Sequence, residues 1–99
     1  MPPLPLPEPR VAAQLPVVYA VGTSDFAGTV VNISRTGVLV RVDHRVPDLG
    51  ARIRLFISNA REQQIEVYAR VVREIPRGFA AQFLAVPIEL LELLADLGG

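Results

Sequence analysis

Hydrophobic and polar residues alternate along most of the chain with a period of two. The alternation forms six short runs rich in β-branched residues, at about 15–21, 26–31, 36–43, 51–58, 64–74 and 78–84. In the third run, for example, Val38, Val40 and Val42 fall on one face, and Leu39 and Arg41 on the other. This period is typical of strands that bury one side, so the pattern predicts six β-strands.

Turn-forming residues separate these runs, as at Gly22–Asp25 and Pro76–Gly78. Short connections favour antiparallel pairing between successive strands. An open sheet of six short strands would expose two edges, which closure into a barrel removes. We therefore expect an all-β fold with one helix, a six-stranded antiparallel barrel. Its predicted core includes Val17, Val30, Val38, Val40, Ile53, Leu55, Ile65, Val67, Phe83 and Leu91.

The last segment changes to a helical period. Glu89, Glu92 and Asp96 recur at i, i+3 and i+7, and apolar residues cover the rest of the surface. Pro87 suits a first helical turn, and Gly98 suits a helix end. The segment carries three acids and no base, hence a charge of −3. We expect this helix to cap one mouth of the barrel, with leucines left over for a homodimer contact.

The first residues have a different composition. Residues 1–9 contain five prolines, which prevent a helix or a central strand and favour an extended polyproline conformation. We therefore divide the chain into a proline-rich flexible leader, residues 1–14, and a barrel domain with its C-terminal helix, residues 15–97.

Composition excludes several function classes. The chain has 99 residues, no cysteine and one histidine, His44, so disulfides, thiolate nucleophiles and two-histidine metal sites are excluded. No paired carboxylates or nucleophile–base pair suggest catalysis, so we expect neither an enzyme nor a cofactor. Ten basic residues balance ten acidic ones, which argues against nucleic acid or anionic lipid as a partner. Without an apolar run of about 18 residues or a basic secretion signal, we expect a cytoplasmic protein with no membrane insertion.

The arginines are unevenly placed. All ten basic residues are arginine, and residues 35–54 hold five of them against two aspartates, a charge of +3. This basic band, comprising Arg35, Arg41, Arg45, Arg52 and Arg54, has two interpretations. It is the polar outer face of two strands, or it is an anion site at one end of the barrel.

One short segment resembles a known family signature. The hexapeptide Asn32-Ile33-Ser34-Arg35-Thr36-Gly37 is similar to the (D/N)xSxxG motif of bacterial PilZ domains. Arg10, in Pro9-Arg10-Val11, resembles the second arginine of the family's RxxxR pair. The run Gly78–Phe83 and the leucine-rich helix after it resemble the family's last elements. The order of elements agrees over roughly residues 9–97.

The resemblance implies a receptor for cyclic di-GMP, a ligand with two phosphates and two guanines. The implied ligand-binding residues are Arg10, Asn32, Ser34 and Gly37, with Gln14 and Arg35 as further candidates. Their chemistry is suitable, because a guanidinium binds phosphate or stacks on a purine and a carboxamide matches a guanine edge. The alternative is an ordinary hairpin corner in which Asn32 and Ser34 cap their own backbone.

The RxxxR pair is incomplete. If Arg10 is its second member, Leu6 stands in the place of the first, and if Arg10 is the first, Gln14 stands in the place of the second. A missing charged hydrogen bond costs on the order of 1.5–3 kcal/mol. In addition, Ala80 stands where a glycine is common in the family, which narrows the space for a ligand.

Two functions therefore compete. The first is a cyclic di-GMP receptor and adaptor in bacterial signalling, in the control of motility, pili or biofilms. The alternative is a PilZ-like module that binds a protein partner of a motility or type IV pilus system and no longer binds cyclic di-GMP.

Overall fold

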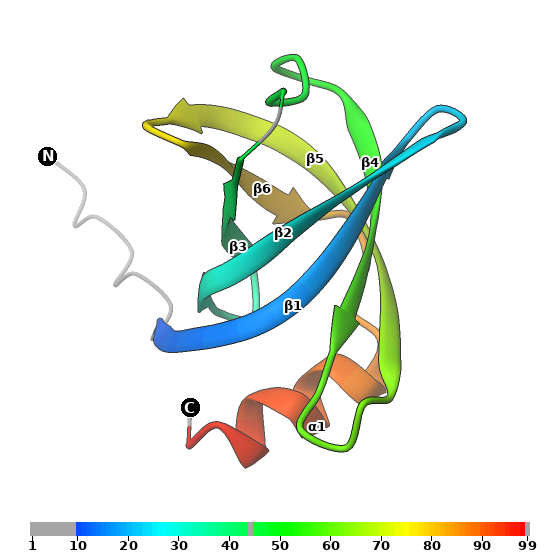
Figure 1. Cartoon of the computed structure of the whole chain (residues 1–99). Coiled ribbons are helices and arrows are strands. Elements are labelled where there is room, and N and C mark those ends of the chain that lie inside the picture. Colours follow the sequence, from blue (N-terminus) through cyan, green and yellow to red (C-terminus); the bar gives the residue numbers. More distant parts are fainter. Residues whose placement is uncertain (1–9, 44, 99) are drawn as a thin grey trace, which may run out of the picture.

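The alternating runs form six strands and the last segment one helix in the computed structural model, which describes residues 10–43 and 45–98 (Figure 1). The elements are β1 (Val11–Val21), β2 (Ser24–Ile33), β3 (Gly37–Val42), β4 (Arg52–Ser58), β5 (Gln64–Ile75), β6 (Gly78–Phe83) and α1 (Ile88–Asp96). The proline-rich residues 1–9, with Leu6, and His44 lie outside the described residues.

The six strands close into an antiparallel barrel in the order β1-β2-β3-β6-β5-β4. This confirms the predicted fold class. One expected neighbour pair is wrong, because β3 pairs with β6 and not with β4. The loop 43–51 that follows β3 is too long for a tight hairpin, and it leads across the barrel to β4, which pairs with β1.

The first strand begins at Val11, four residues earlier than the alternation predicted. Residues 11–14 thus pair with β2, although we had placed them in the leader. The pairing contains a bulge here, since Ala12 pairs with Asn32 and Leu15 with Val30, leaving two residues opposite Val31. The alternation itself continues through the bulge, since Val11, Ala13 and Leu15 are partly buried and Ala12 and Gln14 are exposed. Because both Ala12 and Ala13 are alanine, the contrast between the two faces is weak here, and the sequence does not show where the strand begins.

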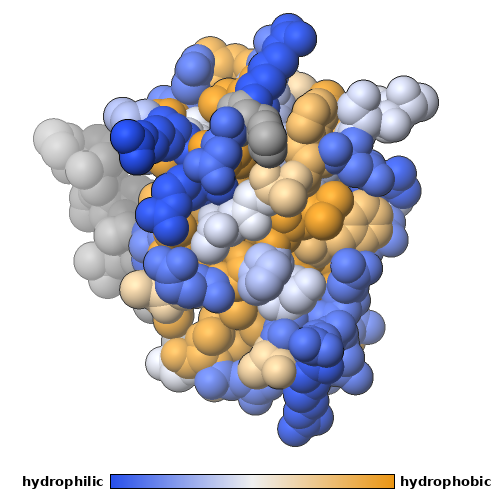
Figure 2. Space-filling view, viewed as in Figure 1, coloured by the Kyte–Doolittle hydropathy of each residue, from blue (hydrophilic) through white to orange (hydrophobic). Residues whose placement is uncertain are grey.

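Inward-facing residues of all six strands form one hydrophobic core. Nine of the ten predicted core residues are buried, and the core also includes Tyr19, Ile33, Ile57 and Phe79. Tyr19 stacks on Phe26 with ring centroids 5.4 Å apart, and Phe79 meets it edge-on at 5.3 Å. On the face shown in Figure 2, hydrophobic residues occupy the middle and polar residues surround them.

The helix α1 lies across one end of the barrel (Figure 1). Leu90, Leu93 and Leu94 are buried there. Leu91, which we predicted in the core, is 39% exposed. Apolar residues surround most of this helix, so its sequence did not show which side is buried. As predicted, Gly98 ends the helix, with φ at +83° and its N–H donating to the Ala95 carbonyl at 3.1 Å.

The barrel has two distinct ends. We call the end with α1, the turn 34–36 and the turn 59–63 the helix end. The opposite end, with the turns 22–23 and 76–77 and the loop 43–51, is the loop end. Among the described residues, no helix is long and apolar enough to cross a membrane.

Candidate functional site

The turn between β2 and β3 is organised by the hydroxyl of Ser34. Its Oγ accepts the N–H of Thr36 at 3.2 Å and the N–H of Gly37 at 3.3 Å, and lies 3.1 Å from the Thr36 Oγ1. The N–H of Ser34 donates to the Gly37 carbonyl at 2.9 Å. Ser34 is only 1% exposed. Its hydroxyl therefore holds the turn together, as the hairpin-corner interpretation expected.

Gly37 is required by the packing of β3 on β6. A Cβ at this position would lie 2.5 Å from the Ala81 carbonyl oxygen, closer than real Cβ atoms approach backbone. The pairing continues beside it, since the Phe83 N–H donates to the Thr36 carbonyl at 2.8 Å. The absence of a Cβ at Gly37 thus allows a close approach of the neighbouring strand β6.

Arg10 and Asn32 lie together at the helix end. The Arg10 Nη1 donates to the Asn32 Oδ1 at 3.1 Å. Arg10 precedes β1 directly, and its near neighbour Ala12 pairs with Asn32 on β2. The early start of β1 therefore places a guanidinium beside the carboxamide that begins the hexapeptide. The side chain of Asn32 is partly exposed and that of Arg10 exposed, so solvent reaches both.

The remaining candidates are also accessible. Gln14 is exposed on β1, and Arg35 is exposed in the turn 34–36. The structure thus gathers the predicted residues at one end of the barrel, with Ser34 and Gly37 inside the turn and the others on the surface. Ala80 is buried in β6 opposite Leu39.

Two further polar side chains lie near this turn that the sequence did not indicate. Gln82 pairs with Gly37 across the β3–β6 ladder, and Arg70 on β5 pairs with Gln82. Both are exposed. The alternation marks them as outward-facing, but only the β3–β6 pairing brings them next to the hexapeptide.

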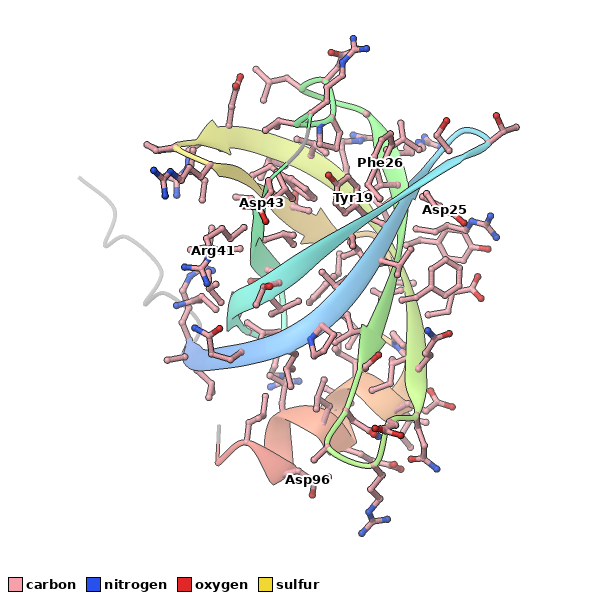
Figure 3. The ribbon with its side chains drawn as sticks, viewed as in Figure 1. Tyr19, Asp25, Phe26, Arg41, Asp43 and Asp96 are labelled. Carbon is pink, nitrogen blue, oxygen red and sulfur yellow. The ribbon has the colours of Figure 1, made fainter. Side chains whose placement is uncertain are left out.

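The basic band does not form one site. Arg35 lies in a turn at the helix end, whereas Arg45 lies in the loop 43–51 at the loop end. Arg41, near the end of β3, extends outward (Figure 3). All five arginines are exposed, so the polar-outer-face interpretation describes them. Among the described residues, no group of three acidic or histidine side chains could hold a metal ion.

The loop end holds a small pocket of about 260 Å³, lined in part by Phe26, Arg45 and Val46. Beside it, the Tyr19 hydroxyl donates to the Arg45 carbonyl at 3.3 Å. Burial raises the pKa of Tyr19. None of the predicted ligand-binding residues lines this pocket.

Comparisons with known proteins agree with this fold. The family model described as the PilZ domain matches residues 7–97. The inhibitor of motility MotI/DgrA from Bacillus subtilis has a similar structure, with a TM-score of 0.77 and 22% identity over 96% of this chain. The PilZ domain of CeSA from a cellulose-synthesizing bacterium has a TM-score of 0.68 and 15% identity, covering 90% of this chain and 93% of that one.

A search among curated proteins found no significant match. The chain spans 50% of the length of MotI/DgrA. The family model nevertheless covers the barrel, the hexapeptide turn, Arg10 and the helix. The chain therefore belongs to the PilZ domain family.

Proposed function

We propose that this domain is a receptor and adaptor for cyclic di-GMP in bacterial second-messenger signalling. The observation that carries the proposal is the hydrogen bond between Arg10 and Asn32, which joins the two parts of the family's signature at one surface. Because one structural neighbour is named as an inhibitor of motility, motility is the first process to examine, before pili and biofilms.

The proposed contacts follow from the exposure of the side chains. The Arg10 guanidinium binds a phosphate or stacks on a guanine, and Asn32 offers an acceptor and two donors to a guanine edge. Ser34 has its hydroxyl occupied inside the turn, so we assign it the role of positioning Asn32 and Arg35. Gln14 and Arg35 extend the polar surface on either side.

Calorimetric titration with cyclic di-GMP tests the proposal. Arg10→Ala should weaken binding by roughly tenfold or more, because a charge-assisted contact with phosphate is lost. Arg45→Ala is the matched control, since it removes the same charge from an exposed residue at the loop end. Equal affinity in the parent and Arg10→Ala, or equal weakening in both variants, would contradict this site.

A second variant examines the incomplete arginine pair. In the preferred alignment Leu6, outside the described residues, takes the place of the first arginine. Leu6→Arg should then tighten binding by roughly tenfold or more and make it more sensitive to salt. If Gln14→Arg tightens binding and Leu6→Arg does not, the alignment of the leader is off by four residues.

The alternative function remains the protein-binding module without ligand. Two features favour this alternative. One arginine of the RxxxR pair is missing, and the Ser34 hydroxyl is already hydrogen-bonded within its own turn. This alternative takes over if neither the parent nor Leu6→Arg binds cyclic di-GMP at submillimolar concentration.

A further inference from the structure

A groove runs between α1 and the turn 59–63 that joins β4 to β5. Its volume is about 580 Å³. In Figure 1 the turn lies beside the helix, below the barrel. The floor is apolar, with Leu15 of β1, Ile65 of β5, and Leu93 and Leu97 of the helix segment. None of the residues proposed to bind cyclic di-GMP lines the groove.

One wall of the groove is acidic. Glu89, Glu92 and Asp96 line it, and Figure 3 shows Asp96 on the helix at the lower end of the molecule. At 100° per residue the three side chains fall within about 60° of one another on the helix. All three are exposed, and α1 contains no basic residue. The acids repel one another at these spacings, so a cation in the groove would relieve an unfavourable interaction.

The opposite wall is formed by a well-braced turn. The Asn59 Oδ1 accepts the N–H groups of Arg61 and Gln63, at 2.9 Å and 3.0 Å. The Asn59 Nδ2 also donates to the Gln63 Oε1 at 3.1 Å. These bonds hold the turn in one conformation, so the groove does not have to be assembled by its occupant, and less ordering entropy opposes binding.

The net charge of the residues that line the groove indicates which kind of segment can bind there. The groove has three acids and one base, Arg61, which gives a net charge of −2. Residues 1–9 contain Glu8 and no arginine or lysine, so the charge of that segment does not match the groove.

We propose that the groove binds a cationic amphipathic segment of a partner protein. Arginine or lysine side chains of that segment meet the acidic wall, and its apolar side chains lie on the leucine and isoleucine floor. This binding is separate from that of cyclic di-GMP, so each can fail without the other.

The test uses a labelled helical peptide with leucines on one face and lysines on the other, and a second peptide in which glutamine replaces each lysine. Fluorescence anisotropy should show that the lysine peptide binds the parent and the glutamine peptide binds much more weakly. The double variant Glu92→Gln/Asp96→Asn should lose at least about fivefold in affinity. Arg61→Gln should increase the affinity, because it removes the one cation in the groove.

The matched control is the double variant Glu66→Gln/Glu74→Gln, which removes the same charge from exposed positions on β5 outside the groove. It should bind the lysine peptide like the parent. Equal weakening in both double variants would show a general charge effect and overturn the proposal. Unchanged or weaker binding by Arg61→Gln would also overturn it. Sedimentation would overturn the proposal as well if it showed that the parent protein self-associates and the groove variants do not. The occupant of the groove would then be a second copy of this chain.

Discussion

At the scale of single residues, the hexapeptide has a role in folding beside the ligand binding proposed for it. Ser34 accepts two backbone N–H groups inside the turn, and Gly37 fits against the Ala81 carbonyl on β6. The presence of Ser34 and Gly37 is therefore explained by the turn itself and is not evidence of ligand binding. Loss of binding in a Ser34 variant is consequently ambiguous, whereas loss in an Arg10 variant is not, because Arg10 is exposed.

Ser34→Ala tests the structural role. The variant leaves the N–H groups of Thr36 and Gly37 without their acceptor, and Gly37 is buried. An unsatisfied buried donor costs about 1–3 kcal/mol, and urea denaturation measures the resulting loss in the free energy of unfolding. Ser24→Ala, at an exposed strand start, should change that free energy by less than about 0.5 kcal/mol. Similar small changes in both variants would show that the turn does not depend on Ser34.

At the scale of elements, the helix separates its residues into a buried side and two exposed sides. Leu90, Leu93 and Leu94 pack on the barrel, and the acids line the groove. Ile88 and Leu91 remain exposed on the third side.

Adjacent leucines give a direct test of the orientation of α1. Leu90 is 0% exposed, so Leu90→Ala should lower the free energy of unfolding by about 2–5 kcal/mol. Leu91 is 39% exposed, so Leu91→Ala should lower the free energy of unfolding by less than about 1 kcal/mol. Chemical denaturation of the two variants measures the difference. The reverse order of costs would mean that the helix packs on its other side.

Charge reversal should stabilise α1 more at its C-terminal end than at its N-terminal end. Asp96 lies near the negative end of the helix dipole and four residues after Glu92, so Asp96→Lys replaces two repulsions with two attractions. Glu89 lies in the first turn, where an acid is favourable. Thermal unfolding should show Asp96→Lys stabilised by several tenths of a kcal/mol. Glu89→Lys should change the stability much less, because the lost dipole interaction is offset by the relieved repulsion from Glu92. Because both variants change the net charge equally, an equal stabilisation in both would contradict this explanation.

The elements also show where sequence reasoning ends. A period of two predicted which residues of the strands face inward, and all nine core residues that it predicted are buried. The period carries no information on which strands pair, so the pairing of β3 with β6 could not be predicted from it. For the same reason, the sequence did not place Gln82 and Arg70 near the hexapeptide. Leu91 was placed wrongly because the helix is apolar on two sides. The candidate site residues came from the motif, which does not show that the Ser34 hydroxyl is buried and bound to backbone N–H groups of its own turn.

At the scale of the whole molecule, the two ends of the barrel carry different groups of polar residues. The helix end carries Arg10, the hexapeptide turn and the acidic groove. The loop end carries Arg45 and the small pocket, and there Tyr19 ties β1 to the loop 43–51. Because every pair of neighbouring strands is antiparallel, successive connections along the chain fall at alternate ends of the barrel.

Alkaline titration tests how the loop end contributes to the stability of the whole molecule. The chain contains no lysine or cysteine, so tyrosine is the side chain whose ordinary pKa lies near 10. Burial raises the pKa of Tyr19 above its usual value of 10.0. Above that pH the unfolded chain loses this proton while the folded protein keeps it, so the free energy of unfolding falls as pH rises, by at most about 1.4 kcal/mol per pH unit. Below pH 10 the contribution is fully present.

Urea denaturation at a series of pH values between 9 and about 12 measures this fall. Tyr19→Phe should flatten the curve, because it removes the titrating group, although it also removes the hydrogen bond to the Arg45 carbonyl and lowers the starting value. Tyr68→Phe is the matched control, since Tyr68 is 52% exposed on β5, and its curve should keep the slope of the parent. If Tyr19→Phe keeps that slope as well, the phenol of Tyr19 is as accessible to solvent in the folded protein as in the unfolded chain. The loop end would then be open around it.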